Sequence, residues 1–159
     1  MGRLAEDGTI PERYPVIELA NASYAERTAK NVADSDGTLI ICNGELMGGT
    51  RETVERCMEK QRPYLVIDCS VVSIDEAIAS ALKFIRALSS RPRPSDDEEL
   101  TLQLPPRDSS VRTGPAVSLG MTVLNVAGPR ASQWPEGHAL TYQIMSAILR
   151  RIIGQKGAN

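Results

Sequence analysis

The sequence is poor in the residues on which several functional classes depend. Its 159 residues include one Trp, one Phe and one His. So few aromatic side chains argue against a stacking platform for single-stranded nucleic acid, and a net charge of −2 provides no basic field for a duplex. No apolar run approaches the roughly 20 residues that span a bilayer, and no signal peptide is visible. We therefore expect a cytoplasmic protein that has neither a nucleic acid nor a membrane as its partner.

Metal ligands and catalytic groupings are also scarce. The three cysteines, Cys42, Cys57 and Cys69, are odd in number and lack metal-ligand spacing, so we expect them to be reduced and buried. The one histidine, His138, belongs to no Ser/His/Asp arrangement, and there is no Walker loop. The sequence therefore predicts no metal site and no catalytic residue, and it favours a binding role over an enzymatic one.

The chain does contain a regular alternation of helical and strand-like segments. Helices are predicted at about 23–34, 50–61, 74–88 and 136–153, and strands at 38–42, 64–68 and 121–126. Two capping boxes, Ser23 with Glu26 and Ser73 with Glu76, mark helix starts. Alternating elements predict an α/β fold, a three-layer parallel sheet with helices on both faces, in a single domain over residues 1–159.

One stretch interrupts this alternation. Residues 91–118 hold five of the ten prolines, an acidic cluster at 96–99, and an alternating pattern at 100–104 that has strand periodicity. We interpret residues 91–118 as an insertion.

Candidate ligand-binding residues follow two of the predicted strands. Gly48 and Gly49 would allow close approach of a ligand or a positive φ, and Thr50 would cap the next helix; the alternative is an ordinary tight turn. Gly128, Arg130 and Ser132 follow the strand at 121–126, where Arg130 would close over an anion and Ser132 would cap a helix.

Three further candidates lie on the first helix and just after it. The planar guanidinium of Arg27 suits a phosphate or another oxoanion; the alternative is an exposed arginine paired with a neighbouring acid. Asp36 would accept a hydrogen bond from a sugar hydroxyl or orient Arg27; the alternative is a turn residue whose side chain hydrogen-bonds to the local backbone. Asn31 would donate to a ligand or cap the end of the helix.

Three motifs carry a resemblance to a known family. They read Arg-Thr-x-x-Asn-Val-x-Asp-Ser-Asp-Gly-Thr-Leu-Ile from Arg27, Gly-Gly-Thr from Gly48, and Leu-Asn-Val-Ala-Gly-Pro-Arg-x-Ser from Leu124. Together they resemble the putative molybdenum carrier family, a Rossmann-like group similar to the Lonely Guy, or lysine-decarboxylase-like, proteins. The resemblance implies an anionic small-molecule ligand: molybdate, molybdenum cofactor or a phosphorylated nucleoside.

The resemblance also raises two alternative functions. Lonely Guy enzymes are phosphoribohydrolases that split nucleoside monophosphates with a glutamate of their Gly-Thr-x-x-Glu motif. Thr53 stands at that position here, and a hydroxyl does not replace a carboxylate beside an oxocarbenium-like centre. A non-binding fragment or interaction subunit is the other alternative.

Family members normally begin with a strand, a glycine-rich loop and a helix for which this chain has no counterpart before its first helix. We expect either an N-terminal truncation or a different segment in that place, with residues 100–104 as the one spare strand. An exposed sheet edge predicts a homo-oligomer.

Overall fold

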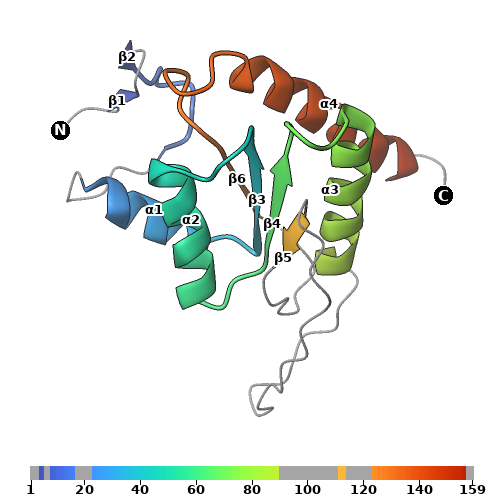
Figure 1. Ribbon diagram of the computed structural model, residues 1–159, viewed down its shortest axis with the longest axis horizontal. Helices are drawn as coiled ribbons and strands as arrows, with labels where there is room; N and C mark the ends of the chain where they lie inside the picture. Colours follow the sequence, from blue (N-terminus) through green and yellow to red (C-terminus); the bar gives the residue numbers. More distant parts are fainter. Residues whose placement is uncertain (1–3, 6–7, 17–22, 90–110, 114–122, 157–159) are drawn as a thin grey trace, which may run out of the picture.

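The computed structural model describes residues 4–5, 8–16, 23–89, 111–113 and 123–156 (Figure 1). The elements, in chain order, are β1 (Leu4–Ala5), β2 (Gly8–Thr9), α1 (Tyr24–Ala33), β3 (Gly37–Cys42), α2 (Gly48–Glu59), β4 (Tyr64–Asp68), α3 (Ile74–Ser89), β5 (Val111–Thr113), β6 (Leu124–Ala127) and α4 (Gly137–Lys156). β1 and β2 form a small antiparallel pair of their own.

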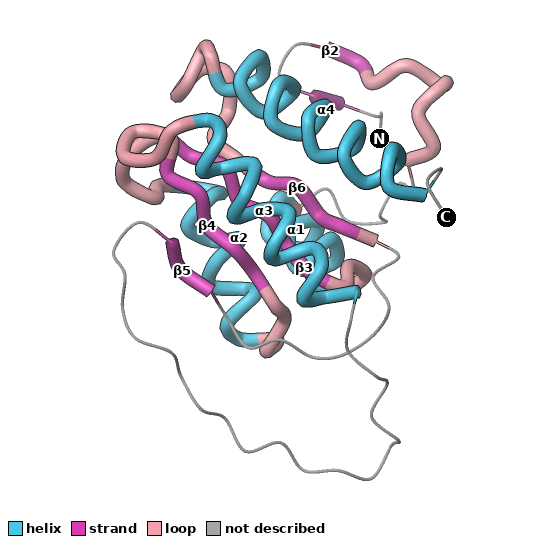
Figure 2. The backbone as a smooth tube through the Cα atoms, turned by 90° about the vertical axis from the view of Figure 1, so that its right-hand side faces the viewer, coloured by secondary structure: helices cyan, strands magenta, loops and turns pink. Residues whose placement is uncertain are grey.

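The central sheet has the strand order β5-β4-β3-β6. β3 pairs in parallel with β4 on one side and with β6 on the other, and β5 pairs antiparallel with β4. Helices α1 and α2 cover one face, and α3 and α4 cover the other (Figures 1 and 2). The predicted α/β, Rossmann-like three-layer fold is confirmed.

The position of β3 inside the sheet, between β4 and β6, explains its largely apolar sequence. All six residues of β3 are buried, because helices pack on both of its faces. Leu39 and Ile41 face the cluster built with α3 and α4, whereas Ile40 and Cys42 face the cluster built with α1 and α2. The alternation of side chains along a strand thus sends neighbouring apolar residues into two separate cores.

One of the two predicted capping boxes is present. Ser73 Oγ accepts a hydrogen bond from the N–H of Glu76, whose carboxylate accepts bonds from the N–H and hydroxyl of Ser73 at 2.8 and 2.7 Å. Ser23 is the N-cap of α1 but makes no side-chain capping bond, so that prediction is wrong. Met58 of α2 is 59% exposed.

Within the predicted insertion, the structure describes only residues 111–113. These form β5, an antiparallel edge strand that the sequence pattern did not predict. The strand candidate at 100–104 lies outside the described residues.

β6, the loop after it and α4 form a strand–loop–helix unit. This unit lies beside β3 in the sheet, but it comes late in the chain, whereas α1 comes just before β3. β6 runs parallel to β3, from Gly37 opposite Leu124 to Ile40 opposite Ala127, and leads through a glycine-containing loop into α4. Such a unit was expected ahead of α1; here the same kind of unit comes last in the described chain.

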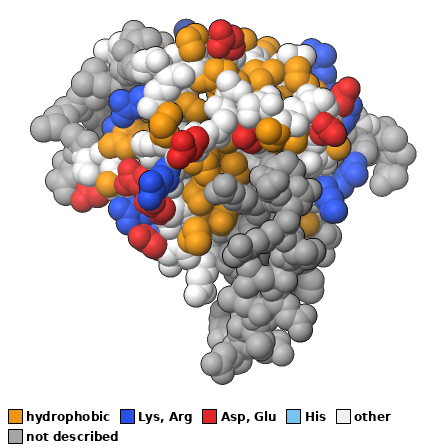
Figure 3. Space-filling view, viewed as in Figure 1, with side chains coloured by type: hydrophobic (Ala, Val, Ile, Leu, Met, Phe, Trp, Pro, Cys, Tyr) orange, Lys and Arg blue, Asp and Glu red, His pale blue; other side chains and the backbone are white. Residues whose placement is uncertain are grey.

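The surface carries charges of both signs. Lys and Arg side chains lie close to Asp and Glu side chains over α2 (Figure 3), where Arg51 pairs with Glu55 and Arg56 with Glu52 and Glu59. Among the described helices, none combines the length and the apolar character that crossing a membrane requires.

Candidate anion-binding site

The carboxyl ends of β3, β4 and β6 define one edge of the sheet, which we call the rim. The three strands are parallel, so their last residues, Cys42, Asp68 and Ala127, lie at the same edge. Helices α2, α3 and α4 begin beyond this edge, and α1, which leads into the opposite end of β3, also begins on the rim side (Figure 1). In open α/β sheets, ligands bind at this edge.

Two arginines from distant parts of the chain converge on one tyrosine at the rim. The guanidinium carbon of Arg27 lies 5.4 Å from the ring centroid of Tyr24, and that of Arg130 lies 5.0 Å from it. Both distances are within the range of cation–π attraction. Tyr24, which is 41% exposed, therefore has a guanidinium group from α1 and another from the loop after β6 near its ring.

The amino end of α2 adjoins this tyrosine. A Cβ built on Gly49 would come within 2.6 Å of the Tyr24 hydroxyl, and a Cβ built on Gly48 would lie 3.7 Å from Nε2 of Gln133. Met47 is the N-cap and provides no side-chain capping bond, so the first N–H groups of α2, at Gly48 and Gly49, have no partner within the helix. Free N–H groups at a helix start and two arginines are the donors that an anion requires.

Neither arginine is neutralised by a carboxylate of the described chain. The ion pairs there join Lys30 to Asp34, Arg51 to Glu55, and Arg56 to Glu52 and Glu59. Arg27 is exposed and pairs with no described acid, which removes the alternative of an ordinary helix ion pair within that part of the molecule.

The glycines are required by packing as well as by any ligand. Gly48 has φ of +50°, a left-handed conformation that a side chain would strain. Gly49 has no space for a Cβ because the Tyr24 ring packs against it. Gly128 lies against the backbone of β3, since a Cβ there would come within 2.6 Å of the Ile41 carbonyl oxygen.

Four other predicted site residues do not join this cluster. Asn31 is exposed on α1, about 10 Å along the helix from Tyr24. Asp36 precedes β3, whose six residues put it about 20 Å from the rim; its carboxylate accepts a bond from the N–H of Val123 at 2.8 Å. Thr50 is 3% exposed inside the first turn of α2, and Ser132 precedes α4 by five residues, so neither caps a helix as predicted.

Sequence reasoning missed Tyr24 and Gln133. Tyr24 was read only as part of a helix start, although its place three residues before Arg27 puts both on one side of the helix. Gln133 follows the recognised Gly128–Ser132 motif by one residue, but no local pattern relates it to Gly48.

Asp68 shapes the loop between β3 and α2. One carboxylate oxygen accepts bonds from the N–H of Gly44 at 2.7 Å and from the N–H and hydroxyl of Ser70 at 2.9 and 2.7 Å. Burial by itself would raise the pKa of Asp68, but these bonds outweigh it and hold the pKa below its usual value. The ionised carboxylate thus ties the ends of β3 and β4 together.

The position that carries a catalytic glutamate in the Lonely Guy enzymes is buried here. Thr53 is 5% exposed, and its hydroxyl donates to the carbonyl oxygen of Gly49 at 2.8 Å. The neighbouring Glu52 is turned toward Arg56, 3.5 Å away. Neither residue presents a carboxylate to the rim.

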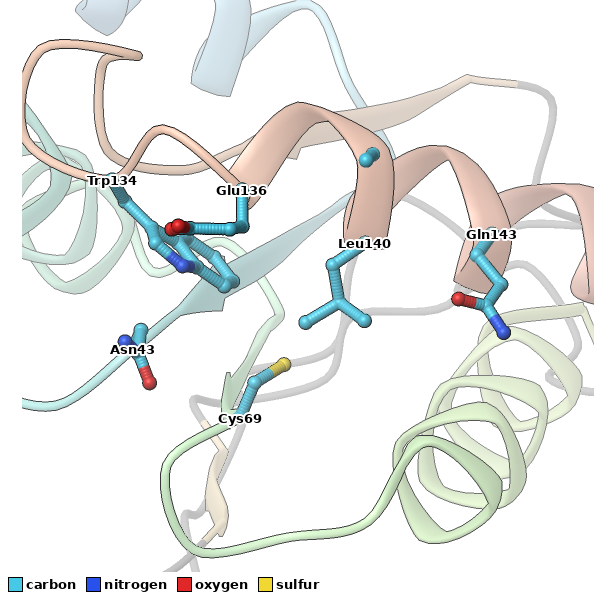
Figure 4. A pocket seen from close by; sticks show the side chains of 7 residues that line it. Asn43, Cys69, Trp134, Glu136, Leu140 and Gln143 are labelled. Carbon is cyan, nitrogen blue, oxygen red and sulfur yellow. The ribbon is translucent and has the colours of Figure 1, made fainter.

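Two pockets lie along the rim on either side of the strand ends. The first, of about 450 Å³, is lined by Trp134, Glu136, Leu140 and Gln143 of the β6–α4 region and by Asn43 and Cys69 (Figure 4). The second, of about 530 Å³, lies against α2 and has three carboxylates, on Glu45, Glu55 and Asp68, in its wall. Its one arginine, Arg51, is paired with Glu55, so this second pocket does not suit an anion.

Comparison with known proteins agrees with this architecture. The circularly permutated YpsA SLOG family matches residues 1–91, more than half of the chain. No curated protein matches. The crystal structure of a protein named putative molybdenum carrier protein, from Syntrophus aciditrophicus SB, is similar at a TM-score of 0.68 and 32% sequence identity, over 93% of this chain and 74% of that one.

A circular permutation also accounts for the order of the elements. It moves a unit from one end of a chain to the other while leaving its place in the fold, and β6, its loop and α4 stand beside β3 although they come last. The match to the family model and the likeness to the carrier structure agree with the resemblance seen in the three motifs. The chain belongs to the circularly permuted YpsA SLOG family, in its molybdenum carrier-like form.

Proposed function

We propose that this protein binds a small anionic molecule at the rim, between Arg27 and Arg130 and beside the start of α2. The observation that carries the proposal is the convergence of both arginines on Tyr24, within 5.4 and 5.0 Å of its ring centroid. An anion bound beside the ring would be attracted by both guanidinium groups. The N–H groups of Gly48 and Gly49 supply further donors at the same place.

The donors suit a tetrahedral oxoanion. A guanidinium binds two oxygens of a phosphate or a molybdate at once, and helix N–H groups bind a third. Molybdate or molybdenum cofactor as the cargo is consistent with the name of the similar carrier protein, and a phosphorylated nucleoside would use the same donors. In each case the oxygens of the ligand are the atoms that this chain holds.

Binding without turnover is favoured over nucleoside monophosphate hydrolysis. The hydrolase needs a carboxylate next to the sugar, whereas Thr53 is buried and Glu52 is engaged by Arg56. Donors that bind a phosphate equally well in the ground state and in the transition state increase the affinity but do not raise kcat. No contact in the described chain favours the hydrolase.

The test is calorimetric titration of the protein with inorganic phosphate and with molybdate. Arg27→Ala and Arg130→Ala are each expected to weaken binding by about 1.5–3 kcal/mol, the range for a hydrogen bond to a charged group. Arg27→Lys should recover only part of this, because an ammonium does not bind two oxygens side by side.

Lys30→Ala is the matched control. It removes one positive charge from the same helix, but Lys30 pairs with Asp34 at 2.7 Å and lies away from Tyr24. Wild-type affinity in both Arg→Ala variants, or an equal loss in the Lys30 variant, would contradict the proposed site.

A further inference from the structure

The loop that leaves β3 contains the one Asn-Gly pair of the sequence, Asn43 followed by Gly44. The backbone nitrogen of the residue after an asparagine can attack the carbon of the side-chain amide, and a glycine leaves that nitrogen unobstructed because it has no side chain. Asparagine is for this reason one of the thermolabile residues. Two other asparagines in the described chain, Asn31 and Asn125, are each followed by a valine, whose branched side chain stands beside the nitrogen.

The fold itself favours a glycine after Asn43. Gly44 has φ of +85°, a conformation that glycine adopts without strain. A Cβ built on Gly44 would meet no atom within 4 Å, so the backbone conformation favours glycine, and not a lack of space. Asn43 is exposed, and its amide forms no hydrogen bond within the part of the chain that the structure describes. A reactive pair of residues thus stands at a turn that a bulkier second residue would strain.

Asp68 holds the nitrogen that would attack. The N–H of Gly44 donates to Oδ1 of Asp68 at 2.7 Å, and the same oxygen accepts from the N–H and the hydroxyl of Ser70. The end of β4 that carries Asp68 is fixed to β3, because the N–H of Cys69 donates to the carbonyl oxygen of Cys42 at 2.8 Å. A turn of the Gly44 nitrogen toward the preceding side chain therefore breaks its bond to Asp68.

The charge of Asp68 opposes the same attack. The Gly44 nitrogen reacts after losing its proton, and the resulting anion would lie next to a carboxylate that is now 2.7 Å away. Although burial alone would raise the pKa of Asp68, the bonds from Gly44 and Ser70 outweigh it and lower the pKa, so the carboxylate is ionised at neutral pH. The fold thus combines a reactive pair with a group that slows its reaction.

We propose that Asn43 is a site of spontaneous deamidation whose rate is set by the hydrogen bond between Gly44 and Asp68. The Gly44 nitrogen forms a bond to Cγ of Asn43 and gives up its proton, the bond from Cγ to Nδ2 breaks, and ammonia leaves with that proton. One water molecule then opens the succinimide ring at either of its carbonyl carbons. The products are an aspartate, and an isoaspartate whose backbone runs through Cβ and Cγ.

Both products would alter the rim. Each adds a negative charge directly after β3, and isoaspartate also inserts its Cβ carbon into the backbone of the loop that leads to Gly48, where α2 begins. A negative charge and a displaced helix start both oppose the binding of an anion. This consequence rests on the proposed function, whereas the covalent change does not depend on it.

The test follows each asparagine of the full chain by peptide mass spectrometry during incubation at neutral pH in a buffer without phosphate. Deamidation changes the mass of the peptide, and its fragmentation separates isoaspartate from aspartate. We expect conversion at Asn43 and none at Asn31, which is also exposed but precedes a valine. Unfolding the wild type in guanidinium chloride should speed conversion at Asn43 about tenfold or more, the factor for losing a hydrogen bond to a charged group.

Asp68→Asn tests the hydrogen bond in the folded protein. Its amide oxygen can still accept from Gly44 but carries no charge, so we expect Asn43 to convert about tenfold faster than in the wild type. Glu76→Gln is the matched control, because it removes another carboxylate near the rim whose bonds are to Ser73, and it should leave the rate unchanged. The comparison of folded with unfolded wild type tests the same bond without a substitution.

The outcomes separate this inference from the proposed function. Equal conversion at Asn43 and Asn31, equal rates in folded and unfolded wild type, or equal rates in folded Asp68→Asn and wild type would each overturn the inference. Calorimetric titration of converted protein should show weaker phosphate binding than fresh protein, and unchanged affinity would overturn the consequence for the rim. Failure of fresh protein to bind phosphate would refute the proposed function and leave the deamidation site in place.

Discussion

At the scale of single residues, two glycines at the rim, Gly49 and Gly128, make room for different neighbours. Gly49 makes room for the Tyr24 ring, whose edge is free to move because the side chain is 41% exposed. Gly128 makes room for the backbone of β3, which is fixed in the centre of the sheet. The first contact affects the arrangement of the arginines, and the second affects the fold.

A Gly→Ala substitution should therefore affect mainly ligand binding at Gly49 and mainly stability at Gly128. Gly49→Ala is expected to displace Tyr24 and weaken phosphate binding, with the free energy of unfolding changed by less than about 1 kcal/mol, since alanine favours a helix. Gly128→Ala is expected to lower the free energy of unfolding by about 1–3 kcal/mol through overpacking. Urea denaturation and calorimetric titration of both variants check this; equal stability loss at both positions would contradict it.

Thr53 provides a second residue-scale prediction. Thr53→Glu, the change that would restore the glutamate of the Lonely Guy motif, puts a carboxylate in place of a 5% exposed threonine whose hydroxyl donates to the Gly49 carbonyl oxygen. We expect a loss of about 3 kcal/mol or more in the free energy of unfolding and no base release from nucleoside monophosphates. Thr53→Val, which loses one hydrogen bond, should cost only about 1 kcal/mol.

Turnover near 1 s⁻¹ by the wild type, abolished by Glu52→Ala, would instead establish the hydrolase. That result would also require Glu52 to leave Arg56 and turn toward the rim.

At the scale of elements, helix and strand ends at the rim are held by carboxylates. Asp68 joins the end of β4 to the loop before α2, and Glu76 completes the box at the start of α3. Bonds from the N–H and hydroxyl of Ser73 hold the pKa of Glu76 below its usual value, as the bonds from Gly44 and Ser70 do for Asp68. The rim is therefore ordered by groups that must remain ionised.

This predicts a loss of stability in acid. A folded-state pKa below the unfolded value stabilises the protein above a pH of about 4, and that contribution disappears as the pH falls through the folded pKa. The midpoint of thermal unfolding should therefore decline between about pH 5 and pH 3. Asp68→Asn and Glu76→Gln should each make the decline shallower; a decline identical to that of the wild type in both variants would contradict this account.

At the scale of the whole molecule, the outer surfaces of β6 and α4 are unusually apolar. In the part of the chain that the structure describes, no strand pairs with the outer edge of β6, and Val126 is 38% exposed. On α4, Tyr142, Leu149 and Ile153 are 70%, 51% and 68% exposed, although Ile144 and Ile148 already provide a buried stripe. A helix that is apolar on two sides is typical of one with two packing partners.

We therefore continue to expect a homo-oligomer, now with α4 in its interface. Ile153→Lys and Tyr142→Lys should shift the mass measured by light scattering toward the monomer, because a lysine on this face opposes burial. Val71→Lys is the matched control, since Val71 is 64% exposed outside α4. A wild-type protein that is monomeric at tens of micromolar would contradict the prediction.

Local patterns in the sequence were enough to predict the four helices and the three parallel strands of the central sheet. The apolar run of β3, the box at Ser73 and the periodic spacing of α3 each depend on residues close in the chain, where side-chain geometry is repetitive. The strand at 64–68 and the helix at 24–33 follow for the same reason. Four of the six residues of the candidate site, Arg27, Gly48, Gly49 and Arg130, could be predicted in this way, whereas Tyr24 and Gln133 could not.

Only the tertiary structure decided which of these residues meet. Arg27 and Arg130 come together because β6, late in the chain, pairs with β3, and no periodicity relates a strand to its partner across so long a connection. Asp36 lies at the opposite end of β3, where it accepts a bond from the N–H of Val123, and Thr50 and Thr53 are buried on α2. Strand order is a property of the packed sheet, and it determines which loops share the rim.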